Sequence, residues 1–304
     1  MKREVENFDE FKTIIMRRLR EVLGEDIIGE EVARRNDTKF FGVMKATQGT
    51  LQRIVYLDTY YEKYKKYPCN IDDMILDIIK NLEAEPDKES LAIISELGDF
   101  SKVRNRLTFK LINYEMSKDY LSNIAYIKFL DLAIIYYVTT GIEDNSAELL
   151  VRQELLKIWG IKLEELHHIA KENMQKLFKI KIETIGSVIS KLFQIPLKKL
   201  QEDTSEEVEM WVLNTERKAF GAVAILYDGA LKDFAATVNS DIIILPSSIH
   251  EVLLVLDKEL EYTKLKSIVK EVNSTVVAKD EILSNNIYIY NRELDKIIML
   301  DSDI

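Results

Sequence analysis

The stretch Asp241–Asp257, DIIILPSSIHEVLLVLD, decides how the second half of the chain is expected to fold. One apolar run, Ile242–Leu245, ends at Pro246, and a second, Val252–Leu256, follows a short polar corner. Short apolar runs bounded by turn residues are typical of strands. These nine positions hold only Ile, Leu and Val, without the alternation of a half-exposed strand. We therefore predict two central strands of a sheet that is covered on both faces.

Two predicted helices flank this strand pair in sequence, Leu231–Val238 and Leu260–Asn273. Each has apolar residues recurring at helical spacing, which makes one side of the helix apolar. We expect one or both helices to pack on the sheet, and the N-terminal half of the chain to cover what remains. The proline is tolerated at the end of its strand, where a missing N–H removes no ladder hydrogen bond.

Periodicity, caps and turn residues predict the other elements of the chain. Helices are predicted at Asn7–Leu23, after Asp58, and at Ile71–Glu83, Leu107–Tyr114 and Leu163–Phe178. Strands are predicted in a hairpin at Val32–Lys45 and at Ile54–Leu57, Leu130–Thr140, Ala147–Trp159, Met210–Thr215, Gly221–Tyr227, Val276–Ala278, Ile287–Tyr290 and Lys296–Leu300.

This order of elements lacks the regular strand–helix–strand alternation of a doubly wound parallel sheet. We predict an α+β fold of two mixed subdomains, each a largely antiparallel sheet with helices packed on one face. The N-terminal α+β subdomain is expected at 1–180 and the β-rich C-terminal α+β subdomain at 210–304. The segment 181–209, with Pro196 and the acidic run Glu202–Glu209, is expected to connect them.

The composition fits a packed protein with an acidic surface. Of 304 residues, 47% are hydrophobic and 31% charged, and the formal net charge is −10. This charge repels phosphate backbones at long range, so nucleic acid is not expected as a partner. The single cysteine, Cys69, excludes an internal disulfide and a cysteine zinc cluster, and it fits a reducing cytoplasmic setting.

No membrane partner is expected either. The first residues, MKREVENFDEFK, contain no apolar signal region. The longest uncharged apolar run, Leu132–Gly141, is about half of the roughly 20 residues that a membrane-spanning helix needs. We expect a cytoplasmic protein with protein partners, and the sequence leaves its oligomeric state open.

The polar corner after Pro246 contains the candidate catalytic residues Ser247, Ser248, His250 and Glu251. In the enzymatic interpretation a serine is the nucleophile, His250 its base, and a carboxylate orients the base. In the structural interpretation a Pro-Ser-Ser turn uses its hydroxyls to bind nearby backbone N–H groups. The corner lacks the glycines that flank the serine of a nucleophile elbow. If the corner leads into a strand, the adjacent His250 and Glu251 point to opposite faces of the sheet. Both points favour the structural interpretation.

No cofactor or metal ion is expected. In HEVLL, Leu254 occupies the place where a zinc protease has its second histidine. Glu164, His168 and Glu172 line one helix face at spacings of four, a pattern that is more typical of a solvated face than of a metal site. The glycine motifs that cradle phosphates are absent from the sequence.

Three segments resemble a known family: WVLNTERKAFGAVAILYDGALKDFA (Trp211–Ala235), ILPSSIHEVLLVLD (Ile244–Asp257) and YIYNRE (Tyr288–Glu293). The family consists of uncharacterised bacterial proteins, typical of Clostridia and their relatives, and has only a domain-of-unknown-function label. Its most specific part is the LPSSIHEVLL motif. The resemblance implies a bacterial cytoplasmic protein associated with mobile elements or phage. It assigns no activity to any position here.

Two functions from different classes remain. The first is a non-catalytic cytoplasmic binding or regulatory protein that acts through protein contacts, which fits the lack of catalytic motifs and the charged amphipathic helices. The second is a hydrolase or transferase that uses Ser247 or Ser248 with His250. The sequence leaves open whether the protein is an enzyme.

Overall fold

The computed structural model describes residues 5–46, 53–67, 70–85, 88–141, 146, 148–193, 209–216, 219–246, 248–257 and 261–300. Within these ranges the chain forms two compact units. The first takes Met1–Arg34 and Thr38–Leu91, and the second takes Arg35–Asp37 and Ala92–Ile304. Residues 92–180, which we expected in the N-terminal subdomain, therefore pack with the C-terminal part of the chain.

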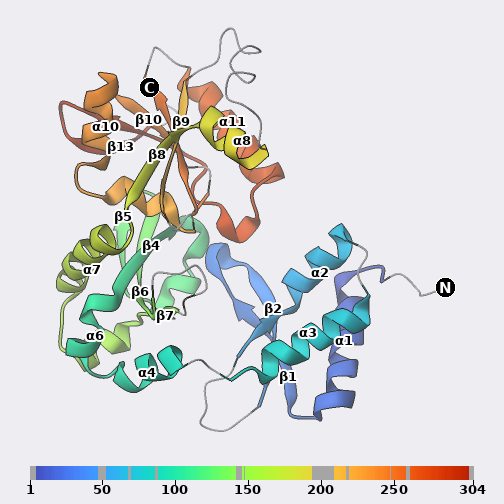
Figure 1. The fold of residues 1–304 in the computed structure, drawn as a ribbon. Coiled ribbons are helices and arrows are strands. Elements are labelled where there is room, and N and C mark those ends of the chain that lie inside the picture. The colour runs from blue at the N-terminus through green and yellow to red at the C-terminus, as the bar shows by residue number, and fades with distance from the viewer. Residues whose placement is uncertain are drawn as a thin grey trace. The chain divides into compact units, whose positions relative to one another are not determined.

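The first unit has a small antiparallel sheet with helices on one face (Figure 1). Its strands, in the order β1-β2-β3, are β1 (Ile27–Ala33), β2 (Lys39–Lys45) and β3 (Val55–Tyr56). Its helices are α1 (Phe8–Leu23), α2 (Leu57–Lys66) and α3 (Ile71–Glu83), and α4 (Lys88–Glu96) crosses into the second unit. The side chains of Asn7 and Asn70 cap α1 and α3, which confirms both predicted helix starts.

The second unit begins with a four-stranded antiparallel sheet in which β6 is central. Its strands are β4 (Leu107–Asn113), β5 (Tyr126–Phe129), β6 (Leu132–Thr139) and β7 (Glu148–Leu150). The predicted buried strand at Leu130–Thr140 is confirmed by β6, whose residues are all buried. The helix predicted at Leu107–Tyr114 is wrong: the segment is β4 and pairs with β6 along its whole length. Pairing with β6, which lies further along the chain, determines the conformation of this segment.

Three helices share a hydrophobic core with one face of this four-stranded sheet. They are α5 (Phe100–Val103), α6 (Gln153–Trp159) and α7 (Leu163–Leu177). The strand predicted at Ala147–Trp159 is only partly correct, because β7 ends at Leu150 and α6 follows. The helix ends at Gly160, where φ is +66° and a glycine is favoured.

A six-stranded antiparallel sheet, in the order β13-β12-β10-β11-β9-β8, completes the second unit. Its strands are β8 (Ile180–Thr184), β9 (Met210–Thr215), β10 (Ile242–Leu245), β11 (Val252–Leu256), β12 (Ile287–Asn291) and β13 (Lys296–Leu300). Its helices are α8 (Ile185–Phe193), α10 (Ala230–Val238) and α11 (Tyr262–Thr275). The central position predicted for β10 and β11 is confirmed.

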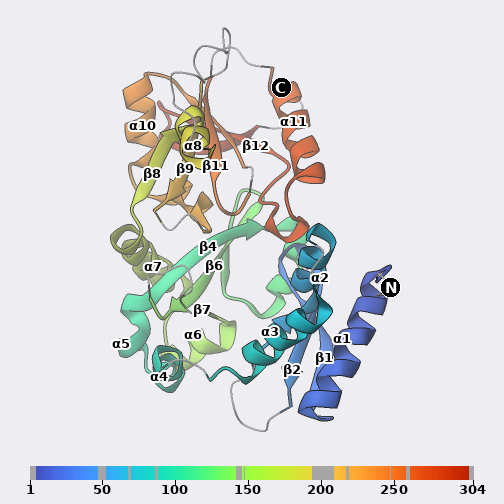
Figure 2. The same cartoon turned by 45° about the vertical axis from the view of Figure 1, so that its right-hand side comes forward.

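Both faces of the β10–β11 pair are covered, as their composition predicts. Ile242 and Ile244 join a core that includes residues of α10, whereas Ile243 and Leu245 join another that includes Val269 of α11. Figure 2 shows α10 and α11 on opposite sides of the sheet. Alternate residues of each strand therefore pack against different helices.

Two other predicted strands of the C-terminal part are wrong. Gly221–Leu226 is a 3₁₀ helix, η5, and residues 276–278 are not a strand. A Cβ at Gly221 would lie 2.6 Å from the backbone oxygen of His250, so the glycine allows η5 to approach the β10–β11 corner. The expected connecting segment supplies β8, which pairs with β9, and its residues 194–208 lie outside the described ranges.

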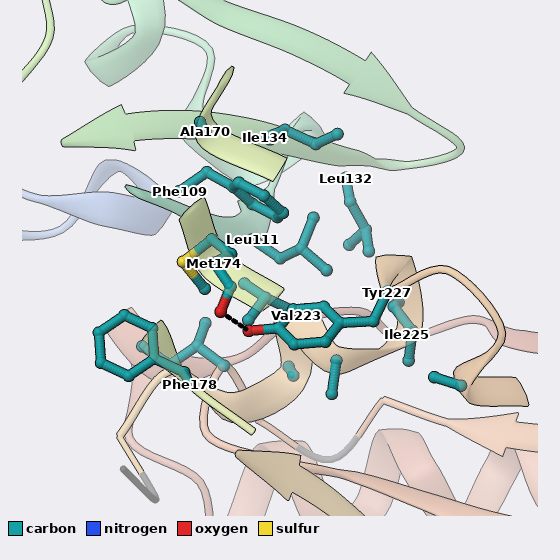
Figure 3. Packing of buried hydrophobic residues seen from close by; sticks show 14 of the residues in the cluster. Phe109, Leu111, Leu132, Ile134, Ala170, Met174, Phe178, Val223, Ile225 and Tyr227 are labelled. Carbon is teal, nitrogen blue, oxygen red and sulfur yellow. Dashed lines mark hydrogen bonds between the residues drawn. The ribbon is translucent and has the colours of Figure 1, made fainter. Parts of the chain in front are cut away.

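One hydrophobic core joins the two sheets of the second unit (Figure 3). Phe109 and Ile134 come from the four-stranded sheet, and Val223 comes from η5. At the centre of this packing the Tyr227 hydroxyl donates a 3.1 Å hydrogen bond to the backbone oxygen of Met174. Residues of the 92–180 segment therefore share this core with Ile242 and Ile244 of the six-stranded sheet.

Candidate functional site

Ser248 belongs to a hydrogen-bonded turn between β10 and β11. Its Oγ donates to Glu251 Oε1 at 3.1 Å and accepts from the backbone N–H of His250 at 3.1 Å. The residue is buried. A serine hydroxyl that accepts a backbone N–H two residues on is the arrangement expected for the structural interpretation of the corner. The other predicted nucleophile, Ser247, lies outside the described residues.

The imidazole of His250 contacts groups from two other segments. Its Nδ1 accepts a 3.2 Å hydrogen bond from the backbone N–H of Phe220, and its Nε2 lies 3.3 Å from Glu281 Oε1. Since Nδ1 is an acceptor, a neutral ring carries its proton on Nε2, facing the carboxylate. The hydrogen bond from His250 lowers the pKa of Glu281 below its ordinary value, despite partial burial.

The structure therefore pairs the predicted residues differently from a catalytic triad. Ser248 is hydrogen-bonded to Glu251, whereas His250 contacts Glu281, a residue that the sequence pattern of the corner does not predict. Ser248 contacts His250 through the histidine backbone. A serine nucleophile needs its hydroxyl within hydrogen-bond reach of the base, and the Ser248 hydroxyl donates to a glutamate instead.

A cluster of charged residues surrounds the ring of Phe220, which has a φ of +57°. The ammonium of buried Lys110 lies 3.5 Å from the ring centroid and forms an ion pair with Glu148. Arg35 also lies over the ring, at 5.4 Å, and pairs with Asp280 at 3.1 Å. Each cation has a carboxylate partner, so the ion pairs join β4 to β7 and Arg35 to the 279–281 segment, and both cations contact the same ring. The sequence offered one signal for it, the lone lysine within the apolar run LTFKLIN.

A groove of about 650 Å³ opens elsewhere on the second unit. Three separate segments line it: the end of β5, the loop that leads from η5 into α10, and the β12–β13 hairpin. Its residues are Phe129, Ile225, Leu226, Tyr227, Asp228, Gly229, Leu231, Lys232, Tyr290, Asp295, Lys296 and Ile297. Local sequence patterns do not predict the groove, because its walls come from segments that are far apart in the chain.

Charged groups at the groove are held by hydrogen bonds. Asp295 accepts from the hydroxyl of Tyr290 at 2.6 Å and from Lys232 at 3.0 Å. Burial and the contact with Asp295 raise the pKa of Tyr290 to about 12, so its hydroxyl remains a donor at neutral pH. Asp228 is paired with Lys171 of α7. Across the described ranges, no carboxylate forms an ion pair with Lys296.

The two histidines of α7 have different environments. His168 lies 3.3 Å from Glu172 on an exposed face, and His167 turns inward, where its Nδ1 lies 3.0 Å from the Tyr136 hydroxyl. In the part of the chain that the structure describes, no group of three or more His, Cys, Asp or Glu side chains could hold a metal ion. The described helices include none that is long and apolar enough to cross a membrane.

Comparisons with known proteins identify a family and no individual relative. No curated protein matches the chain, and no solved structure matches it. The family model DUF5688, described as a family of unknown function, matches residues 8–292. This match covers most of both units, including the His250 corner and much of the groove. The chain therefore belongs to the DUF5688 family of unknown function.

Proposed function

We propose that the protein is a non-catalytic binding or regulatory protein that acts through protein contacts, and that the groove is its binding surface. The observation that carries the proposal is the groove itself, which combines apolar walls with charged groups at fixed positions. Protein-binding surfaces typically combine an apolar centre containing aromatic residues with a polar rim.

The lining supplies both parts of such a surface. Phe129, Tyr227 and Tyr290 contribute aromatic rings, and Leu231 and Ile297 contribute aliphatic side chains. Aromatic residues commonly account for much of the binding energy at protein interfaces. The charged groups then restrict which segments can bind, because a like charge placed opposite them costs free energy.

The proposal includes a bacterial cytoplasmic setting with an association with mobile elements or phage. Its support is the resemblance of the LPSSIHEVLL segment and the low cysteine content, with Cys69 as the single cysteine. The acidic net charge of −10 supports protein rather than nucleic-acid partners.

Peptide selection tests the binding function. A displayed library of random peptides is selected against the full chain, and the affinity of the selected peptides is measured by fluorescence anisotropy. Phe129→Ala, in the groove, should weaken binding about tenfold, which corresponds to about 1.4 kcal/mol. Phe100→Ala, which alters a partly buried ring packed on Trp159, is the control and should leave affinity unchanged. Failure to select any peptide, or equal effects of the two variants, would overturn the proposal.

A hydrolase or transferase is the second candidate, and the His250–Glu281 pair is the observation that favours it. A histidine oriented by a carboxylate is one part of a nucleophilic site. A fluorophosphonate probe separates the two functions, because it labels activated serines. Labelling that disappears in Ser247→Ala or Ser248→Ala would favour the enzyme over the binding protein.

A further inference from the structure

The strand β13 forms one end of the six-stranded sheet. Within the described residues its strand partner is β12, with which it pairs from Asn291↔Lys296 to Ile287↔Leu300. An edge strand presents the N–H and C=O groups of alternate residues away from the sheet. Such an edge is a template on which another extended chain can pair.

Exposed apolar side chains lie in β13 and in the turn before it. Ile298, in the middle of the strand, is 39% exposed, and Leu294, in the preceding turn, is 59% exposed. The edge strand β5 of the four-stranded sheet differs, because Lys128 lies within it, 3.8 Å from Glu115 and 4.3 Å from the Tyr114 ring centroid. A charged residue in the middle of an edge strand is a common protection against pairing.

The groove continues from the edge of β13. Lys296 and Ile297 of β13 line it, together with Tyr290, which pairs with Ile297 on the neighbouring strand. A chain added along β13 would place alternate side chains on the side of the sheet where Ile297 contacts the main core. The same chain could therefore form backbone hydrogen bonds with the edge and place side chains in the groove.

The charges indicate the chemistry of the added chain. Lys232 and Tyr290 already occupy the carboxylate of Asp295. The ammonium of Lys296, at the start of β13, has no ion-pair partner anywhere in the described ranges. A carboxylate on the added chain would complement Lys296, and apolar residues on the side of Ile297 would complement the groove.

We propose that β13 accepts an extended segment of a partner protein as a seventh strand of this six-stranded sheet. The segment has apolar residues at every second position and an acidic residue beside Lys296. Main-chain hydrogen bonds then supply affinity, and the groove supplies selectivity, as in other cases of strand addition. This inference rests on the proposed function, since it specifies how the partner binds at the groove.

Methylation of peptide nitrogens tests the inference, because it removes one N–H at a time while keeping the side chains. Each residue of a peptide selected against the full chain is N-methylated in turn. Strand addition predicts an alternation in which every second methylation weakens binding about tenfold or more and the intervening ones change it by less than about twofold. If the peptide binds but its methylated forms show no such alternation, strand addition is overturned, and the proposal that the groove binds proteins still stands. If no peptide binds, both proposals are overturned.

Hydrogen exchange and charge reversal locate the added strand. Peptide binding should slow amide exchange in Lys296–Leu300 and leave residues 126–128 of the β5 edge, which lie outside the groove lining, unchanged. Slowed exchange at β5 alone would overturn the assignment to β13. Lys296→Glu should weaken a peptide with an acidic residue about tenfold, whereas Lys270→Glu on the exposed side of α11 should not. Equal effects of the two lysine variants would contradict the charge assignment.

Discussion

Tyr288 donates a 2.7 Å hydrogen bond to the buried carboxylate of Asp131, a residue 157 positions earlier in the chain. Ser284 and Asn286 donate to the other oxygen of the same carboxylate, at 2.5 and 2.9 Å. Asp131 follows Leu130, which has a φ of +55° in the turn between β5 and β6. The bonds therefore join a turn of the four-stranded sheet to β12. A buried carboxylate is stable only when such donors satisfy it.

Replacing Tyr288 by phenylalanine removes one of these donors and should lower the free energy of unfolding by about 1.5–3 kcal/mol. Tyr262→Phe is a matched control, because the Tyr262 hydroxyl also donates to an aspartate, Asp257, at 2.9 Å, but from a partly exposed position. Its cost should stay below about 1 kcal/mol. Urea melts at neutral pH measure both values. Equal costs would show that the buried network adds nothing beyond an ordinary surface bond.

Ile243→Ala tests the importance of the central strand pair for stability. Ile243 is 0% exposed and packs in the core that includes Val269 of α11, so the cavity should cost about 2–5 kcal/mol. Ile298→Ala makes the same chemical change at an exposed position of the same sheet, and should cost about 0.5 kcal/mol. A wild-type urea melt for Ile243→Ala would show that β10 is not a core strand.

The contact between His250 and Glu281 makes a testable contribution to acid stability. Its hydrogen bond lowers the pKa of Glu281 below the ordinary value of 4.5. The contribution is therefore present above about pH 4.5 and is lost as the pH falls through the lower folded-state pKa. Glu281→Gln should be less stable than wild type near neutral pH, and the difference should shrink in acid. Urea midpoints across this range measure it, with exposed Glu293→Gln as the control. A difference in urea midpoint between wild type and Glu281→Gln that does not change with pH would contradict a contribution from the ionised Glu281.

Asn36 offers a test of a strained and buried turn. Its φ is +56°, and its side-chain nitrogen donates to the backbone oxygens of Lys279 and Ile282 at 2.8 and 2.9 Å. Asn36→Ala leaves both oxygens without this donor and places alanine in a left-handed conformation, at a cost of roughly 2–4 kcal/mol. Asn36→Gly also loses the hydrogen bonds but relieves the backbone, and should be more stable than the alanine variant. The reverse order in thermal melts would contradict this explanation.

Local signals were enough to predict the elements whose conformation local chemistry determines. Periodicity predicted the helices at Asn7–Leu23 and Ile71–Glu83, and the composition of Ile242–Leu245 and Val252–Leu256 predicted buried central strands. The incorrect predictions of secondary structure have a different cause. Leu107–Asn113 is a strand because β6 pairs with it, and Lys110 is tolerated within it because Glu148 and the Phe220 ring surround its ammonium. Both partners are distant in sequence.

The candidate site also has features that local sequence predicts and features that depend on residues distant in the chain. The Pro-Ser-Ser sequence predicted a turn with a bonded hydroxyl, and the geometry of Ser248 agrees with that interpretation. The pairing of His250 with Glu281 depends on how the 279–281 turn packs beside the β10–β11 corner. The groove depends on three separate segments. Spacing along the sequence contains no information about contacts of this kind.

The central claim is that the groove, rather than the His250 corner, is the binding surface. An NMR titration of the ¹⁵N-labelled full chain with a selected peptide tests it most directly. We predict that amide shift changes concentrate in Ile225–Lys232 and Tyr290–Ile298, the segments at the groove and at the start of β13. Changes that concentrate instead at Ser248–Glu251, Phe220 and Glu281 would contradict the claim and would place the site at the corner.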